Sequence, residues 1–500
     1  MKRVRVSISI LLGYVSLLVR FVSAFIFSVV VIRSLSPDDF SVWVFGFSIL
    51  SLFSVGYDLW GWVFARRYAL GVLSSLYAGM ILNTVYAVSS SILLLALSEY
   101  LYSYLGSQFI YISLFVFNLS LNALVSLASY TSSTLRPDVY LSSALVFEIS
   151  RVTVAYIMIR VARLGLEGAI LSPALASIIS SLYILYLLQR SNLLHIEKRD
   201  LWRETKNILK ISVAGLVGSV ANTLWNLDRI LLTIIARVFE TVSFLGVGYS
   251  LRNIISQITS IPATTAYAKL LEDREYPVRN ILMISLVISI PSLGIMMVLV
   301  KPLVSLLNPA YISASNIVAI MLVDGFIVSL ANLFISIATG FDRRDLYIQS
   351  LRELFETSVA RVRVANMIRA FIFALSSLIY SLGVYIGLIP RDPLKIMLFV
   401  VVTLLVLSIS YLIFSVREML RFVRIDLRKR DLYPIIVSLT PALLYLILTR
   451  SYDIVISSVW RDLSLLVFHT IISLGIYVLI LYATSDWFKY FLKRYLRYLL

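Results

Sequence analysis

Residues 8–32 read ISILLGYVSLLVRFVSAFIFSVVVI, an apolar stretch in which Arg20 is the only charged side chain. A helix of about 20 apolar residues crosses the hydrocarbon of a bilayer, so this stretch is long enough to span it. Lys2, Arg3 and Arg5 precede it, as in a signal peptide, but no Ala-x-Ala cleavage site follows. We therefore expect an uncleaved first transmembrane helix.

Apolar stretches of spanning length recur along the whole chain. Of its 500 residues, 60% are hydrophobic and only 14% are charged, which is too few charges to cover a soluble domain. Unpaired backbone groups are costly in lipid, and the stretches are too long and continuous for barrel strands. The sequence predicts an all-α integral membrane protein. Its about 14 transmembrane helices are expected at 8–32, 40–63, 69–98, 107–134, 140–160, 166–188, 208–235, 243–268, 280–300, 312–340, 365–388, 395–416, 433–449 and 463–484.

The distribution of the 44 lysine and arginine residues predicts the orientation. With the N-terminus in the cytoplasm, about 30 of them fall in inside loops and about 9 in outside loops, as the positive-inside rule requires. Both termini are therefore expected in the cytoplasm. The net charge of +17 then reflects topology rather than nucleic-acid binding, because no soluble basic domain is available. Residues 346–363 and the tail from Trp487 are interpreted as amphipathic helices on the lipid headgroups.

The longest inside linker predicts the domain organisation, because it follows the sixth transmembrane helix. We expect an N-terminal lobe at 1–190 with helices 1–6, followed by a cytoplasmic linker at 191–207. A C-terminal lobe at 208–416 would hold helices 7–12. Residues 417–500 would form two extra helices and a basic amphipathic tail.

Polar and charged side chains stand inside several predicted helices, where a charge is expensive unless it faces protein or water. Guanidinium groups suit bidentate contacts to phosphate. The candidate substrate-binding residues are therefore Arg20, Arg151, Arg229, Arg252, Asn222 and Asn226. The candidate counter-charges or ion-coupling residues are Glu148, Asp228 and Asp324.

The spacing of these residues carries further information. Glu148 and Arg151 are three residues apart on one helix face, so they can form an ion pair. Between 208 and 235, polar residues recur at alternating steps of three and four, which predicts one polar face on a single helix. The alternative interpretation is that the polar stripes are helix–helix contacts, since small and polar residues also allow close packing.

The residue types that are missing exclude several kinds of site. Without cysteine there is no disulfide, thiolate zinc site or cysteine nucleophile, and two histidines are too few for a histidine metal cage. No G-x-x-x-x-G-K-[ST] motif is present, so the chain is not expected to be an ATPase. We expect no enzyme activity, no catalytic residues, no metal and no cofactor. A membrane-embedded enzyme of glycan assembly stays an alternative, with Asp453 and Asp462 in the last outside loop as its carboxylates.

Short motifs stand at the ends of predicted helices. Residues 33–40, RSLSPDDF, follow the pattern R-x-L-[GS]-P-x-[DE]-[FY], with Ser41 where a glycine is usual. The further motifs, in chain order, are LGLEGA at 164–169, LDRI at 227–230, GVGY at 246–249 and LLNPAY at 306–311. In order and placement these motifs resemble those of the polysaccharide-export flippases, which belong to the multidrug/oligosaccharidyl-lipid/polysaccharide exporter superfamily.

The resemblance implies two six-helix lobes, arranged as an inverted V around a central cavity, with two extra C-terminal helices. It also implies translocation of a polyprenyl-(di)phosphate-linked oligosaccharide from the cytoplasmic to the outer leaflet by alternating access, for surface polysaccharide or glycoprotein assembly. The family's Asp-Arg motif maps to Asp228 and Arg229, whereas Glu148 beside Arg151 departs from the family pattern.

The implied setting is the cell membrane, with the protein as a multi-pass monomer. Its implied partners are the lipid-linked substrate, membrane lipids and glycosyltransferases of the same pathway, and no nucleic acid. A cation-coupled exporter of drugs or of a cell-wall precursor lipid, from the same superfamily, is the main alternative.

Overall fold

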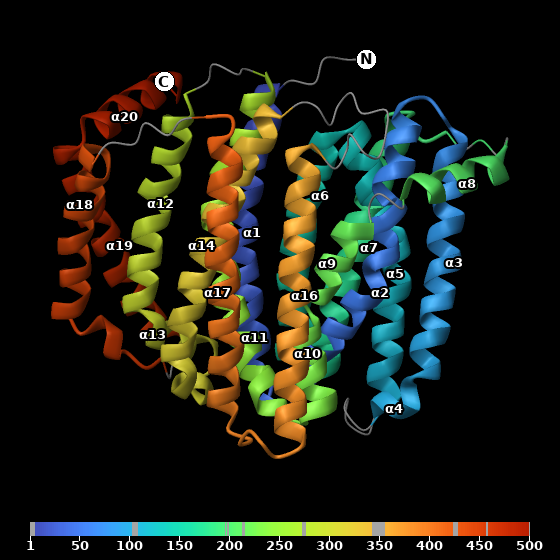
Figure 1. The fold of residues 1–500 in the computed structure, drawn as a ribbon, viewed down its shortest axis with the longest axis horizontal. Helices are drawn as coiled ribbons and strands as arrows, with labels where there is room; N and C mark the ends of the chain where they lie inside the picture. Colours follow the sequence, from blue (N-terminus) through green and yellow to red (C-terminus); the bar gives the residue numbers. More distant parts are fainter. Residues whose placement is uncertain are drawn as a thin grey trace. The chain divides into compact units, whose positions relative to one another are not determined.

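The structure is a computed structural model, and all the regular structure that it describes is helical (Figure 1). The described residues are 6–102, 109–195, 197, 200–212, 216–272, 277–342, 356–423, 429–456 and 459–499. Ten helices in this part are long and apolar enough to cross a membrane, or 11 if one bent helix pair counts as a single span. The expected all-α, multi-pass membrane fold is confirmed. The count of about 14 spans and the cytoplasmic termini stay predictions.

The helices group into two compact units, each built from two separate stretches of the chain. The first unit comprises Met1–Gly246 and Asn366–Pro393, and the second comprises Val247–Ala365 and Leu394–Leu500. The lobes, linker and C-terminal segment expected from the sequence, with boundaries at 190, 207 and 416, stay predictions.

The first unit is built around α5. Its elements are α1 (Val6–Ser34), α2 (Pro37–Ala69), α3 (Ser74–Ala96), α4 (Ser98–Tyr102), α5 (Phe109–Leu135), α6 (Pro137–Ala155), the π-turn η1 (Tyr156–Val161), α7 (Gly165–Arg190), α8 (Leu201–Ser212), α9 (Leu216–Leu224), α10 (Leu227–Leu231), the π-turn η3 (Leu232–Ala236), the first residues of α11 (Phe239–Glu272) and most of α16 (Ser358–Tyr385). Helix α5 packs against α2, α3, α6 and α7, which run beside it (Figure 1).

The RSLSPDDF motif forms the start of α2. The Ser36 hydroxyl accepts a hydrogen bond from the Asp39 backbone N–H at 3.1 Å and donates one to the Asp39 carboxylate at 2.8 Å. Pro37 occupies the first helical turn, where its missing N–H is not needed. Helix capping therefore explains why serine, proline and aspartate occur at these positions of the motif.

The second unit holds the C-terminal helices. Its elements, besides most of α11, are α12 (Val278–Val298), α13 (Val300–Leu307), η4 (Pro309–Ala314), α14 (Ser315–Phe341), α17 (Pro393–Leu420), α18 (Lys429–Leu448), η6 (Ser451–Asp453), α19 (Val459–Thr484) and α20 (Asp486–Leu499). The tail from Trp487 forms α20, which lies across the ends of its neighbours (Figure 1). The Trp487 indole donates to the Asn280 side chain at 3.1 Å and so fastens α20 to α12. The other expected amphipathic helix, at 346–363, falls largely outside the described residues.

The segment 208–235 differs from the single polar-faced helix expected there. It is divided among α8, α9, α10 and η3, and α8 and α9 are bent by 60°. Polar side chains compete for the backbone at the second break: the Thr223 hydroxyl donates to the Ser219 carbonyl and the Asn226 amide to the Asn222 carbonyl. A continuous polar stripe along one helix therefore does not form.

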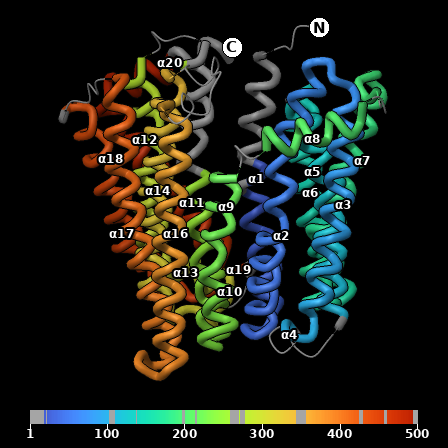
Figure 2. The backbone as a smooth tube through the Cα atoms, turned by 45° about the vertical axis from the view of Figure 1, so that its right-hand side comes forward, coloured from blue at the N-terminus to red at the C-terminus, as the bar shows by residue number. Residues whose placement is uncertain are grey.

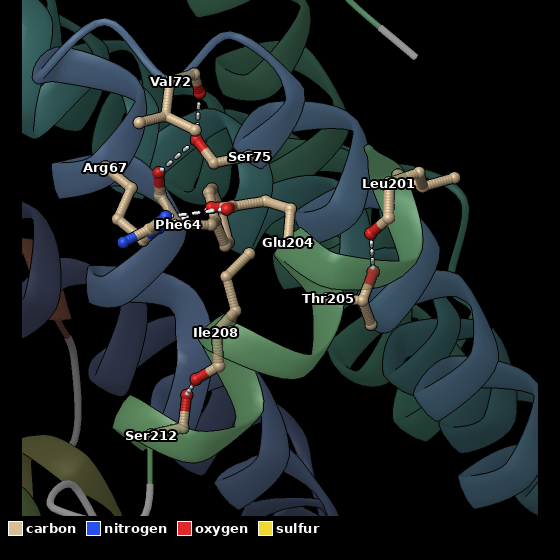
Figure 3. Close-up of polar contacts among 9 residues, drawn as sticks. All are labelled: Phe64, Arg67, Val72, Ser75, Leu201, Glu204, Thr205, Ile208 and Ser212. Carbon is tan, nitrogen blue, oxygen red and sulfur yellow. Dashed lines mark hydrogen bonds and ion pairs between the residues drawn. The ribbon is translucent and has the colours of Figure 1, made fainter. Parts of the chain in front are cut away.

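Helix α8 is fastened crosswise to α2 and α3 (Figure 2). At the end of α2, Arg67 donates to Glu204 of α8 through Nε at 2.5 Å and through Nη2 at 2.7 Å (Figure 3). Glu204 is only 5% exposed, and Ile208, one turn later, is fully buried. The Tyr68 hydroxyl holds the preceding chain, because it accepts from the His195 backbone N–H at 2.8 Å.

Arg67→Gln should destabilise this attachment, because it leaves the buried Glu204 carboxylate without its cation. We expect a loss of about 1.5–3 kcal/mol in unfolding free energy, measured by thermal unfolding in detergent. The matched control is Arg66→Gln, since Arg66 is exposed. Equal melting temperatures for the two variants would contradict a stabilising role of the ion pair.

Candidate functional site

The charged residues of α1 and α6 come together. Arg151 Nη2 donates to Glu148 Oε2 at 2.6 Å, so the expected ion pair within α6 is present. Arg20 of α1 interacts electrostatically with the same Glu148 carboxylate. Helices α1 and α6 pack along each other, so Arg20 lies within electrostatic range of the carboxylate that Arg151 binds directly.

Packing against aromatic rings fixes the orientation of Arg151. Its Cζ lies 4.5 Å from the ring centroid of Phe27 on α1 and 5.4 Å from that of Phe147 on α6. Within the described residues its Nε is buried and has no hydrogen-bond partner. A buried donor of this kind is costly, and an anion that accepted from it would remove the cost.

Asp228 and Arg229 lie directly after the break between α9 and α10. Asp228 is fully buried, and its Oδ1 is 3.8 Å from Arg229 Nε. Arg229 Nη1 also lies 3.4 Å from the hydroxyl of Ser48 on α2. Broken membrane helices expose backbone polar groups, and such breaks commonly form binding sites in transporters. The sequence does not indicate Ser48, because a serine in a membrane helix is usually an ordinary helix–helix contact.

The two candidate asparagines make local contacts. Asn222 is exposed on α9, and Asn226 donates its amide to the Asn222 carbonyl at 3.2 Å. The Asn226 side chain thus contacts the backbone at the break between α9 and α10, where Asn222 contributes its backbone carbonyl.

Sequence reasoning missed Arg369, which α16 brings to this break. Arg369 is 7% exposed, and its Cζ lies 4.4 Å from the ring centroid of Trp225, the residue that follows α9. The Trp225 ring in turn packs on Phe373, with centroids 5.2 Å apart. The sequence feature that could have indicated Arg369 is its position as an arginine inside the predicted helix 365–388.

In the second unit Arg252 and Asp324 form an ion pair between α11 and α14. Arg252 Nε donates to Asp324 Oδ2 at 2.5 Å, and Asp324 is fully buried. Gly325 permits this approach, because a Cβ there would lie 2.8 Å from the Arg252 carbonyl oxygen. Asp324 Oδ1 is buried without a hydrogen-bond partner among the described residues, so the carboxylate depends on Arg252.

The site residues thus form three groups: Arg20, Glu148 and Arg151; Asp228 and Arg229; and Arg252 with Asp324. The first two groups belong to the first unit and the third to the second unit. In the described part of the chain, no three His, Cys, Asp or Glu side chains are placed to hold a metal ion. The arrangement offers hydrogen-bond donors with positive charge, each next to a carboxylate.

Comparison with known proteins identifies the fold. No family model and no curated protein matches the sequence. Among solved structures, the lipid II flippase MurJ in an inward closed conformation matches with a TM-score of 0.60 at 13% identity, covering 95% of this chain and 98% of that chain. An inward-facing multidrug resistance MATE family transporter of the MOP superfamily matches with a TM-score of 0.54 at 14% identity, covering 81% of this chain and 94% of that chain.

A third match, to a MATE structure in complex with MaL6, has a TM-score of 0.55 at 13% identity and covers 83% of this chain and 95% of that chain. Identities this low establish the fold alone. The chain therefore shares the fold of these three solved structures, whose names describe a lipid II flippase and MATE proteins.

Arg252→Met should strongly destabilise the second unit, because it leaves Asp324 as an unpaired buried carboxylate. Breaking a buried ion pair on one side costs about 3–5 kcal/mol, whereas replacing both partners by apolar residues is often close to neutral. Thermal unfolding should therefore show a large loss for Arg252→Met and a recovery for Arg252→Met/Asp324→Leu. If the double variant is no more stable than the single one, the two side chains do not act as a pair.

Proposed function

We propose that this protein translocates a polyprenyl-(di)phosphate-linked oligosaccharide from the cytoplasmic to the outer leaflet by alternating access. The supporting observation is that the first unit holds guanidinium groups at Arg20, Arg151, Arg229 and Arg369, all in segments that the sequence predicts to span the membrane. A phosphate group that crosses hydrocarbon needs compensating positive charge, and the planar fork of arginine matches phosphate oxygens.

The neighbouring carboxylates act as counter-charges in this proposal. Glu148 keeps Arg151 charged and oriented without leaving an unpaired charge inside the membrane. Guanidinium has five N–H donors, so the single bond to Glu148 leaves others for a ligand, including the unpartnered Nε. Glu148, Asp228 and Asp324 are also the candidates for proton or sodium coupling.

The alternatives fit the geometry less well. An exporter of organic cations needs carboxylates that are available to a cation. Glu148 and Asp324 are each paired with an arginine, so among the described residues this alternative would have to use Asp58 of α2, which accepts from the Tyr130 hydroxyl. An enzyme of glycan assembly needs carboxylates at an aqueous face, but Asp453 lies in an exposed ion pair with Lys301 at 3.6 Å. The match to MurJ, a lipid II flippase, extends over 95% of this chain and favours a lipid-linked cargo.

The setting of the protein belongs to the same proposal. We place it in the cell membrane as a monomer whose partners are the lipid-linked substrate, membrane lipids and the glycosyltransferases of the pathway. It would serve the assembly of a surface polysaccharide or glycoprotein.

Purified protein in liposomes, given a fluorescent lipid-diphosphate oligosaccharide, tests the proposal. Protein-dependent movement between leaflets should be seen with the wild type and should fall about tenfold or more in Arg229→Gln and Arg20→Gln, as expected from loss of a charge-assisted hydrogen bond. Arg229→Lys keeps a charge beside Asp228 but lacks the fork, so an intermediate rate is expected.

The matched control is Arg160→Gln, because Arg160 is exposed on η1. It should flip the lipid at the wild-type rate. Folding of every variant is checked by its thermal unfolding curve. A wild type that elongates or transfers the glycan without moving it would instead establish the enzyme alternative. Equal rates in wild type and folded arginine variants would remove these residues from the site.

A further inference from the structure

A polar cavity of about 440 Å³ lies inside the first unit, apart from the arginine residues described above. Its wall is formed by one face of α5 and by parts of α2 and α6. Asn122, Ser126, Ser129 and Ser133 recur along α5 at helical spacing and all line the cavity. The volume falls in the range of small-molecule sites, about 300–1,000 Å³.

The opposite wall presents a carboxylate whose position is set by a tyrosine. The Tyr130 hydroxyl donates to Asp58 Oδ1 at 2.9 Å. Gly61 makes this possible, because a Cβ at that position would overlap the Tyr130 ring. Within the described residues Asp58 has no cation partner, and its second oxygen has no hydrogen bond. Asp58 is exposed to the cavity, so this oxygen can accept from a ligand.

An unsatisfied donor points to a ligand as well. Ser126 is 8% exposed, and its hydroxyl is buried without a hydrogen-bond partner among the described residues. Most serines in these helices donate to their own backbone, as Ser54 and Ser133 do. A buried hydroxyl without a partner is unfavourable, and a polar ligand in the cavity would satisfy it once the Ser126 side chain turned its hydroxyl toward the cavity.

The composition of the wall decides which ligand fits. Among the described residues, no lysine or arginine lines the cavity, so the wall offers no cation to a phosphate, and Val125 is the only aliphatic lining residue. A metal ion would need several close oxygen ligands, and the described residues hold no acidic cluster for one. Hydroxyl, amide and carboxylate groups with three tyrosine rings instead match a neutral ligand that both donates and accepts many hydrogen bonds.

We infer that this cavity binds a neutral glycosyl group, with Asp58, Asn122 and Ser126 as its hydrogen-bonding partners. The inference rests on the proposed function in one respect, because it assigns the sugar of the lipid-linked substrate to the α2–α5–α6 cavity. The phosphate and the sugar would then be recognised by different chemistry on different helices of the first unit.

Binding of free sugars to the full-length protein tests this inference without transport. Protein in lipid nanodiscs, which avoids sugar-headed detergents, is titrated with methyl glucoside, methyl galactoside and methyl N-acetylglucosaminide, with saturation-transfer NMR as the readout. At least one glycoside should bind the wild type. Ser126→Ala should weaken that binding about two- to tenfold, the value of one hydrogen bond.

Two further variants keep the test informative. Ser120→Ala is the matched control, because Ser120 lies on the same helix, outside the cavity, and pairs with Ser91. It should bind like the wild type. Asp58→Asn keeps a hydrogen-bond acceptor but removes the charge, so glycoside binding should weaken only a few-fold. A cation site would behave differently: the wild type would bind a tetraphenylphosphonium probe, and Asp58→Asn would lose that binding. Loss of a hydroxyl that has no partner should leave the stability of Ser126→Ala unchanged.

The outcomes separate this inference from the proposed function. Failure of every glycoside to bind at millimolar concentration, or equal binding by wild type and Ser126→Ala, overturns the sugar site even if the lipid is flipped. Tetraphenylphosphonium binding that depends on Asp58 overturns it in favour of a cation site. Glycoside binding that depends on Ser126, in a protein that flips no lipid-diphosphate sugar, supports the sugar site and removes the proposed function.

Discussion

Charge compensation inside the membrane is the constraint on which the rest of this structure depends. Hydrocarbon offers no water to an ion, so each buried charge must meet an opposite charge or a dipole of the protein. Arg151 meets Glu148 within one helix, whereas Arg252 meets Asp324 across two helices. The second pair forms only because Gly325 lets α11 and α14 approach closely. The charges therefore help to determine which helices pack together.

The break between α9 and α10 is the second consequence of polar groups in an apolar chain. At the break, Thr223 and Asn226 bond the backbone of their own segment, and side chains of neighbouring helices contact the residues beside it. Ser48 of α2 reaches Arg229, and Arg369 of α16 covers Trp225. The segment 208–235, which the sequence predicts as one helix, is thus divided, and α2 and α16 contact it at the break between α9 and α10. Such junctions give a membrane protein fixed polar groups without a large aqueous domain.

The first unit contains two kinds of polar group. Guanidinium groups near carboxylates stand on α1, α6 and α10, while hydroxyl and amide groups, with no basic residue among the described ones, line the cavity between α2, α5 and α6. A cation near the cavity would pair with Asp58, which instead has only the Tyr130 hydroxyl among the described residues.

The sequence by itself determined the all-α membrane class, the positions of most helices and the local pair of Glu148 and Arg151. These features depend on apolar length and on spacing within one helix, which a linear sequence displays directly. The tertiary structure alone decided the partner of Arg252, 72 residues away, the place of Arg369 and the meeting of Tyr130 with Asp58 beside Gly61. In a membrane helix, lipid-facing and protein-facing surfaces are both apolar, so the hydrophobic pattern does not say which helix faces meet.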